Sequence, residues 1–315
     1  MKTVLYQLLK WLGVFWLARR LTRDQARILC YHGFSYRDEH LFSAPLFMRT
    51  EVFAERLALI ERMGFDVISL DELSTRLHQK QSLRNTLIFT VDDGWTGFAE
   101  MAWPLLAAKQ WPCTLYLTTW CMQHRLPVLN VLRRYLQWKG ISLPNLDADD
   151  QIAWQQIQGV AQAGDLTTSN GQALFHLISL EQTENLVKQG LDIQLHTHRH
   201  RVPEQDNLLI KELEDNRQFL EQAPSIRSEN LNHFCYPSGE YRPVQFATLA
   251  RAQIKTATTT ELGLVRSNSH PYALPRLLDA DNISALEFEA ELSGFKSLVR
   301  RYLKTRSSPS HEAYP

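Results

Sequence analysis

The chain has 315 residues, of which 44% are hydrophobic and 22% charged, and this composition excludes a largely disordered or fibrous protein. Its length suits either one large α/β domain with extensions or two domains of about 150 residues each. Lys and Arg together number 34, as do Asp and Glu, so the overall charge argues against a nucleic-acid partner, which usually carries a basic excess.

The first 27 residues are basic and contain two tryptophans. The apolar stretch 11–18 is too short to span a bilayer, which needs about twenty residues, and it is followed by Arg19 and Arg20 where a signal peptide would have a small-residue cleavage site. We therefore predict an amphipathic helix in residues 1–27 that docks on a membrane surface. An uncleaved anchor and an ordinary helix packed on the domain are the alternatives.

Short apolar or alternating runs follow, with helical patterns between them. Eight strands are predicted, over residues 28–32, 65–69, 86–91, 114–118, 191–196, 233–236, 255–259 and 273–278. Helices are predicted over residues 50–63, 70–78, 97–109, 206–222 and 243–252. This alternation is typical of a parallel sheet or barrel.

Two segments depart from the alternation. Residues 120–190 form looser helical pieces, which we interpret as an insertion. Residues 284–315 are predicted to form a C-terminal helix, over 284–306, and a tail. The basic end of that helix suits either a solvent-exposed face or a second contact with a membrane.

A pair of acidic residues follows one of the buried strands. Asp92, Asp93 and Gly94 come directly after the apolar run 86–91. Adjacent carboxylates at the end of an apolar strand raise each other's pKa unless a cation or a metal neutralises one of them. A positive group is therefore expected at this strand end, although such a turn alone is also common in ordinary loops.

Three histidines follow another predicted strand. His196, His198 and His200 come directly after the run 191–195, where no hydrophobic core needs them. Imidazole is the commonest metal ligand in proteins, and two histidines with one carboxylate form a recurring catalytic site for zinc and related metals. Because α/β barrels gather their active sites at the carboxyl ends of their strands, the histidines and the Asp pair are expected to lie together.

These motifs resemble those of the polysaccharide deacetylase family, carbohydrate esterase family 4, which has the NodB-homology domain. Residues 90–94 resemble its Thr-Phe-Asp-Asp-Gly motif, and residues 196–200 match its His-(Ser/Thr)-x-x-His motif. Weaker similarities lie at residues 31–33, 234–239 and 274–276. The resemblance implies an α/β fold, a distorted (β/α)7-type barrel over residues 28–283, with the helical insertion at about 120–190.

The family pattern implies a role for each residue that it matches. Asp92 is then the general base, whereas Asp93, His196 and His200 hold a divalent metal, with Zn²⁺ as the first candidate and Co²⁺, Ni²⁺ or Fe²⁺ as others. Residues that would contact the substrate, one of them through a backbone N–H that stabilises the oxyanion, are Tyr236, Pro237, Gly239 and Tyr241.

Two features of the family pattern are missing here. Many members have an arginine in the segment that corresponds to residues 234–241, and this chain has none there, so we expect Arg276 to orient Asp92 instead. The late Leu-x-His motif that supplies a general acid is also missing, and His32 is the candidate for that role. The alternative is that His32 only forms a hydrogen bond at the rim of the barrel.

The function implied by the resemblance is metal-dependent hydrolysis of N-acetyl groups from a sugar. The substrate would be a bacterial surface glycan or a lipid-linked glycan intermediate, and the alternatives are a deformylase, another C–N amidohydrolase, or a catalytically silent carbohydrate-binding module. Four widely spaced cysteines without a CxxC pair favour the cytoplasm, peripheral to the inner membrane, over an anchored form that faces the periplasm.

Overall fold

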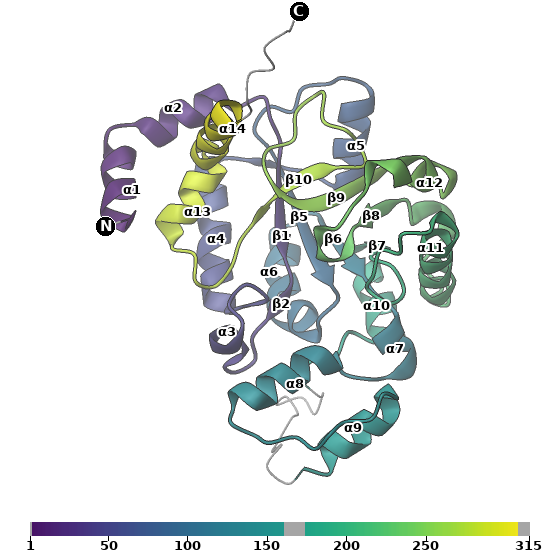
Figure 1. Ribbon diagram of the computed structural model, residues 1–315. Helices are drawn as coiled ribbons and strands as arrows, with labels where there is room; N and C mark the ends of the chain where they lie inside the picture. Colours follow the sequence, from purple (N-terminus) through teal and green to yellow (C-terminus); the bar gives the residue numbers. More distant parts are fainter. Residues whose placement is uncertain (1, 161–173, 308–315) are drawn as a thin grey trace, which may run out of the picture.

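The protein is built around a closed barrel of parallel strands, shown in the computed structural model of Figure 1, which describes residues 2–160 and 174–307. Seven strands form the ring, namely β1 (Arg27–Tyr31), β5 (Thr86–Asp93), β6 (Cys113–Leu117), β7 (Asp192–Leu195), β8 (His233–Cys235), β9 (Thr256–Leu262) and β10 (Leu274–Leu278). β1 closes the ring because it pairs with both β5 and β10. The predicted (β/α)7-type barrel is confirmed.

Three further strands lie outside the ring. β4 (Asp66–Val67) pairs with the first residues of β5, so all eight predicted strands are present. β2 (Gly33–Phe34) and β3 (Phe47–Met48) form a separate parallel pair that was not predicted. A run of two residues is too short for an alternating pattern to reveal it.

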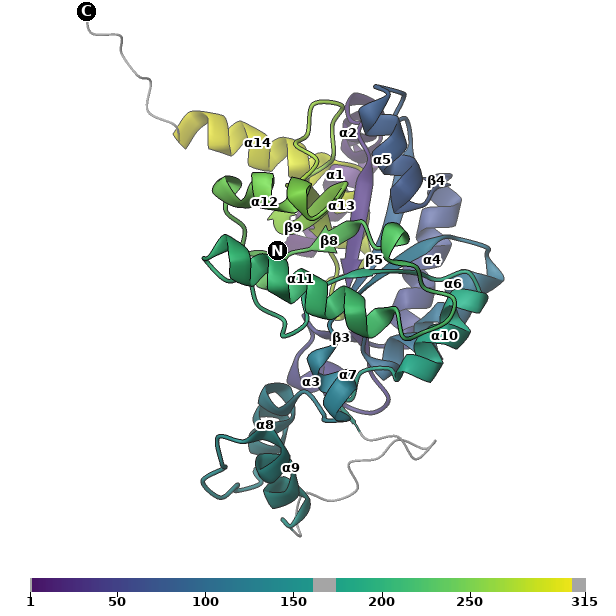
Figure 2. The ribbon, with the colours of Figure 1, turned by 90° about the vertical axis from the view of Figure 1, so that its right-hand side faces the viewer.

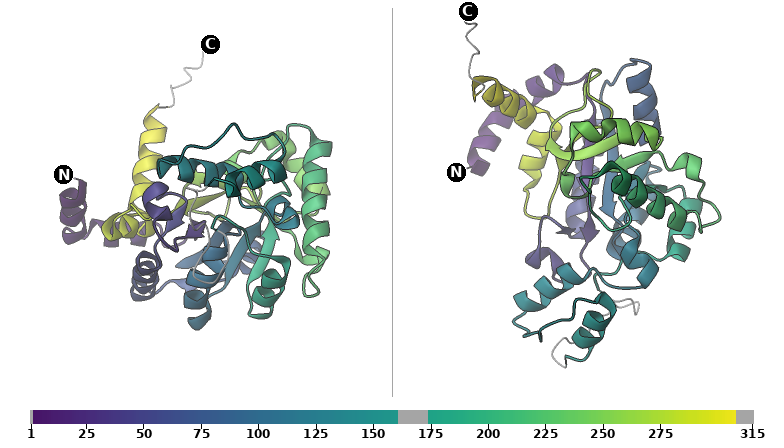
Figure 3. Two further views of the ribbon diagram at one scale, coloured as in Figure 1. Left: turned by 90° about the horizontal axis from the view of Figure 1, so that it is seen from below. Right: turned by 45° about the vertical axis from the view of Figure 1, so that its right-hand side comes forward.

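Helices cover the outside of the barrel, as Figure 3 shows from two further sides. They are α4 (Thr50–Met63), α5 (Leu70–His78), α6 (Trp103–Ala108), α10 (Leu180–Lys188), α11 (Asp206–Leu220) and α12 (Phe246–Arg251). The predicted helix over 97–109 begins as a π-helical turn before α6, and that over 243–252 begins as a 3-10 turn before α12. Parallel strands joined by such helices are the expected arrangement for this alternation.

The segment 120–190, predicted as an insertion, contributes several helices. α7 (Trp120–His124), α8 (Leu129–Trp138) and α9 (Asp150–Gln158) precede α10. α8 and α9 project beyond the carboxyl ends of the barrel strands (Figures 1 and 2), whereas α10 lies against β7. A short helix, α3 (Glu39–Phe42), contacts α8. Residues 161–173 of this segment lie outside the described residues.

The N-terminal segment forms two helices where a single amphipathic helix was predicted for residues 1–27. α1 (Lys2–Trp11) and α2 (Val14–Leu21) are separated at Gly13, which has a φ of +75°, a conformation that glycine adopts without steric cost. In residues 2–160 and 174–307, every helix is too short or too polar to cross a lipid bilayer.

The C-terminal segment also differs from the single helix predicted over 284–306. It divides at Gly294 into α13 (Ala285–Leu292) and α14 (Phe295–Ser307), and residues 308–315 of the predicted tail lie outside the described residues. The ring of Phe295 packs against Phe15 of α2 and Tyr6 of α1, at 5.7 and 6.4 Å between centroids. The two ends of the chain are therefore joined through an aromatic cluster.

Gly97 lies where the chain after β5 passes against β2. A Cβ atom at this position would overlap the carbonyl oxygen of Phe34, and a strand backbone cannot move aside as a flexible side chain can. We expect Gly97→Ala to lower the free energy of unfolding by about 1–3 kcal/mol, measured by urea denaturation. Gly159→Ala is the matched control, because its Cβ would have no neighbour closer than 3.5 Å. Equal losses in the two variants would contradict this explanation.

Candidate active site

Six of the predicted site residues lie together at the carboxyl end of the barrel. They are His32 after β1, Asp92 and Asp93 at the end of β5, His196 and His200 after β7, and Arg276 in β10. Because all seven strands of the ring run in the same direction, motifs far apart in sequence meet at one end of it.

Asp93 lies beside two histidines of the 196–200 motif. Its Oδ1 atom is 3.3 Å from Nε2 of His196 and 3.2 Å from Nε2 of His200. Nδ1 of His196 is 2.8 Å from the carbonyl oxygen of Cys235 and must donate to it, since a carbonyl only accepts hydrogen bonds. The Nε2 lone pair of a neutral His196 is thus available, and one atom from each of the three side chains lies within 4.8 Å of the other two. This is a donor set suited to a divalent metal.

The two neighbouring aspartates have different cationic partners. Arg276 donates Nη1 to Oδ1 of Asp92 and Nη2 to Oδ2, both at 2.7 Å, and both side chains are buried. Asp93 is also buried, yet among the described residues no lysine or arginine forms an ion pair with it. Since a buried carboxylate is costly without a positive partner, the set of Asp93 and two imidazoles fits a bound cation.

Both aspartates are ionised at neutral pH. Burial alone would raise the pKa of Asp92, but the charge and hydrogen bonds of Arg276 hold that pKa well below its usual range. Burial acts in the same direction on Asp93, where hydrogen bonds with His196 and His200 outweigh it and lower the pKa. Asp92 therefore keeps the charge that a proton acceptor requires, and Asp93 keeps the charge that a metal ligand requires.

The loop that carries His200 is held in place by α11. Glu212, only 2% exposed, accepts a hydrogen bond from the backbone N–H of Arg199 at 2.8 Å, and Asn216 accepts one from the backbone N–H of His196 at 3.1 Å. Neither residue was among the predicted site residues. Their position in the predicted helix could have identified them, because both polar side chains lie on its apolar face, where such residues are uncommon.

Two thiols also contact Asp92. Sγ of Cys235 and Sγ of Cys30 lie 3.4 and 3.6 Å from its Oδ2 atom, and both cysteines are buried. In the sequence these residues are two of four widely spaced cysteines without a CxxC pair, and neither was predicted to lie in the site. The sequence did contain a hint for Cys30. Side chains two residues apart in a strand point to the same side, so Cys30 at the end of β1 shares a side with His32.

His32 lies beside Asp92 at the edge of the cluster. Its Nε2 atom is 3.8 Å from Oδ2 of Asp92, and its side chain is 24% exposed whereas that of Asp92 is 4% exposed. His32 is thus accessible to a bound molecule and close to the carboxylate at the same time, as the predicted role of proton donor requires.

The two tyrosines among the predicted substrate-binding residues have their hydroxyls bonded within the protein. The hydroxyl of Tyr236 donates to the carbonyl oxygen of Tyr272 at 2.9 Å, and that of Tyr241 to Oε1 of Glu261 at 2.8 Å. Neither these tyrosines nor Pro237 and Gly239 are among the described residues that line the cavity of about 430 Å³ beside Asp93 and His200.

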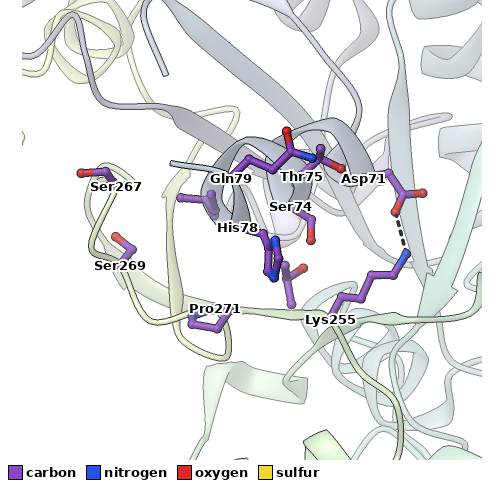
Figure 4. A pocket seen from close by; sticks show the side chains of 11 residues that line it. Asp71, Ser74, Thr75, His78, Gln79, Lys255, Ser267, Ser269 and Pro271 are labelled. Carbon is purple, nitrogen blue, oxygen red and sulfur yellow. Dashed lines mark hydrogen bonds and ion pairs between the residues drawn. The ribbon is translucent and has the colours of Figure 1, made fainter. Parts of the chain in front are cut away.

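A second cavity, of about 460 Å³, lies at the amino end of β9, and Figure 4 shows the side chains that line it. Lys255 and Thr256, at the start of β9, line it together with Asp71, whose Oδ1 atom is 3.4 Å from Nζ of Lys255. None of the predicted site residues lines this cavity, whereas Asp93 and His200 line the smaller one at the carboxyl end.

Trp95 supports Asp93 from the side opposite the histidine contacts. Its indole Nε1 donates to Oδ2 of Asp93 at 2.8 Å, which leaves Oδ1 for a metal. We expect Trp95→Phe to raise the Kd for Zn²⁺ by about tenfold to a hundredfold, because a supporting hydrogen bond orients a ligand atom. The measurement is competition with a chromophoric chelator. Trp103→Phe is the control, since that indole bonds to Gln189 at 3.1 Å, away from the site; equal weakening would refute the assignment.

Comparison with known proteins identifies the family. A family model described as polysaccharide deacetylase matches residues 79–257. The chain belongs to the polysaccharide deacetylase family. The match includes the Asp-Asp pair and the histidine motif, whereas His32 and Arg276 lie outside it. A search of the curated proteins found no match.

Solved structures share the fold of this deacetylase. PplD from Streptococcus pyogenes, a deacetylase in complex with acetate, has a TM-score of 0.61 at 19% identity, over 85% of this chain and 98% of its own. IcaB from Ammonifex degensii has a TM-score of 0.61 at 16% identity, over 86% and 97%. A de-N-acetylase from Aggregatibacter actinomycetemcomitans has a TM-score of 0.60 at 12% identity, over 85% and 100%. At these identities the likeness establishes the barrel fold.

The family assignment confirms the predicted type of reaction. This polysaccharide deacetylase is a hydrolase that acts on amide bonds of sugars, and its family is generally metal-dependent. The catalytically silent binding module considered from the sequence is therefore set aside.

Proposed function

We propose that this deacetylase removes acetyl groups from the nitrogen of an N-acetylated sugar, in a bacterial surface glycan or a lipid-linked glycan intermediate, with Zn²⁺ as the metal. The proposal rests mainly on the different partners of the two aspartates at the end of β5. Arg276 neutralises Asp92, whereas the partners of Asp93 are two imidazoles. Such ligands also suit Co²⁺, Ni²⁺ and Fe²⁺, which are the other candidates. The similar fold of a de-N-acetylase supports the choice of the acetamide bond.

Each residue of the site has a separate task in this reaction. Asp93, His196 and His200 would hold the ion, which when bound polarises the amide carbonyl and lowers the pKa of a bound water. Asp92 accepts the proton of the attacking water, and Arg276 keeps its carboxylate oriented through two hydrogen bonds of 2.7 Å. His32, 3.8 Å from Asp92, donates a proton to the departing nitrogen. The products are acetate and a sugar with a free amine.

The test is acetate release from N-acetylated oligosaccharides by the purified, zinc-loaded protein. We expect release by the native protein and a loss of about a hundredfold or more in Asp92→Asn, which keeps the shape of the side chain but cannot accept the proton. Parallel assays use N-formylated sugars. Release of formate without release of acetate would reject the proposal and show that the protein is a deformylase.

We propose further that the protein lies on the cytoplasmic face of the inner membrane; an anchored form that faces the periplasm is the alternative. The support is the surface of α1 and α2, where Trp11 is 80% exposed, Trp16 65% and Leu21 63%, beside the basic side chains of Arg20 and Arg23. Exposed tryptophans amid cations suit the interface of an anionic bilayer. Four free cysteines are compatible with a reducing compartment.

Pelleting with anionic liposomes tests the membrane contact. Removal of residues 1–27 is an ambiguous test, because Arg27 is buried and donates from Nε to the carbonyl oxygen of Leu292 at 3.0 Å. The double variant Trp11→Ser/Trp16→Ser is sharper, since both side chains are exposed, and we expect it to pellet less. Trp138→Ser on α8, where the indole is 46% exposed, is the control. Equal pelleting of all three proteins would reject the contact.

A further inference from the structure

The cavity beside the metal-binding residues is formed by two parts of the chain. Asp93, Trp95 and His200 line it from the barrel, and residues 120–121, 128–131 and 150 line it from the insertion. Its volume of about 430 Å³ is in the range of small-molecule sites, about 300–1,000 Å³. The insertion therefore provides the outer wall of the place where a sugar would reach the metal.

This outer wall is attached to the barrel at two points. The backbone N–H of Trp120 donates to the carbonyl oxygen of His198 at 2.8 Å, and that of Ile178 donates to the carbonyl oxygen of Gly94 at 2.9 Å. The rings of Tyr135 and Phe175 pack at 4.9 Å between centroids. A wall held by both hydrogen bonds and packing can discriminate between ligands, because it cannot yield to each one.

The charge on this wall is negative. Asp150, the first residue of α9, lines the cavity, is exposed, and forms no ion pair with any described residue. The helix does not need Asp150 as its cap, because Asp149 already accepts hydrogen bonds from the backbone N–H groups of Gln151 and Ile152.

The cation that lines the cavity does not offset Asp150. Arg199 forms its ion pairs with Glu212 and Asp215, at 3.3 and 3.1 Å, and not with Asp150; Arg201 and Lys211 share these two carboxylates. A divalent metal on Asp93 would leave a positive charge on the barrel side of the cavity, whereas Asp150 places a negative charge on the insertion side. An acidic sugar whose carboxylate lies against the insertion would thus meet the charge of Asp150, which pairs with no described cation.

We propose that Asp150 is a specificity residue that excludes acidic sugars and admits neutral or amine-bearing N-acetylated glycans. The inference rests on the proposed function and specifies which class of N-acetylated glycan the enzyme accepts. It places the selection in the insertion, outside the two motifs that would hold the metal.

The experiment compares two probes, an uncharged N-acetylglucosamine oligosaccharide and a hyaluronan oligosaccharide in which N-acetylglucosamine alternates with a uronic acid. Binding of both to the full chain is measured by calorimetry at low salt, and acetate release is measured in parallel. Asp150→Lys is expected to shift the ratio of the two Kd values by about tenfold in favour of the acidic probe, with a smaller shift in Asp150→Asn. The shift should shrink as the salt concentration is raised.

Glu214→Lys is the matched control, because it makes the same change of charge at an exposed position of α11 that does not line the cavity. The proposal is overturned if the ratio stays constant in Asp150→Lys, if Glu214→Lys shifts it as much, or if the native protein binds neither probe. Failure of the proposed function has a different signature, namely that the native protein binds the neutral probe at the cavity without releasing acetate.

Discussion

Arg276→Met is expected to lower the free energy of unfolding by about 3–5 kcal/mol and to reduce deacetylation by about a hundredfold or more. The physical reason is that both hydrogen bonds to Asp92 disappear together, at an arginine that is fully buried and a carboxylate that is 3% exposed. Methionine fills most of the volume of the arginine side chain, so the loss of stability and activity measures the effect of the missing charge. Urea denaturation and acetate release are the measurements.

A second variant separates the charge effect from a packing effect. In the double variant Asp92→Asn/Arg276→Met no uncompensated carboxylate remains, so its free energy of unfolding should exceed that of Arg276→Met alone, although it stays inactive. Activity close to that of the native protein in Arg276→Met would show that Asp92 needs no oriented cation. A double variant less stable than both single variants would show that packing is the main role of Arg276.

Asp93→Asn and His200→Asn are expected to lose bound zinc, with a fall in acetate release of about a thousandfold or more, since a metal contributes several kcal/mol to such a reaction. Asparagine keeps the size of the aspartate but removes the negative charge beside both imidazoles. Metal content after equilibration with limiting zinc is measured by mass spectrometry.

His198→Asn is the matched control for His200→Asn, because both histidines lie in the same loop. Nδ1 of His198 is 2.7 Å from Oγ1 of Thr119, on the side of α7, and His198 belongs to no metal-binding set among the described residues. It should retain near-stoichiometric zinc. Full zinc content in Asp93→Asn would place the metal elsewhere, and zinc loss in His198→Asn would point to a general effect on the loop.

The strands and most helices of the barrel follow from local patterns. α4 and α5 begin and end where the sequence predicts, because Gly64 ends the first and Ser69 caps the second. The predictions differ from the structure where one residue interrupts a continuous amphipathic pattern. Gly13 and Gly294 divide predicted single helices because their positive φ angles, +75° and +79°, lie outside the range of a right-handed helix.

The candidate metal ligands could be predicted from the sequence because each motif is short and lies at a strand end. Asp93 follows its strand directly, and His196 and His200 belong to one five-residue run. The partner of Asp92 was harder to predict, since Arg276 lies 184 residues away, and only the alignment of β5 and β10 in the closed ring brings the two side chains together.

The sequence by itself determined the alternation of strands and helices, the family motifs and the candidate ligands, because these depend on residues close together in the chain. Only the tertiary structure decided that Arg276 holds Asp92 through two hydrogen bonds, that Cys30 and Cys235 contact Asp92, and that Asp150 lines the cavity. Those features depend on how the strands close and where the insertion packs. They are set by burial and charge summed over the whole core, which no local pattern contains.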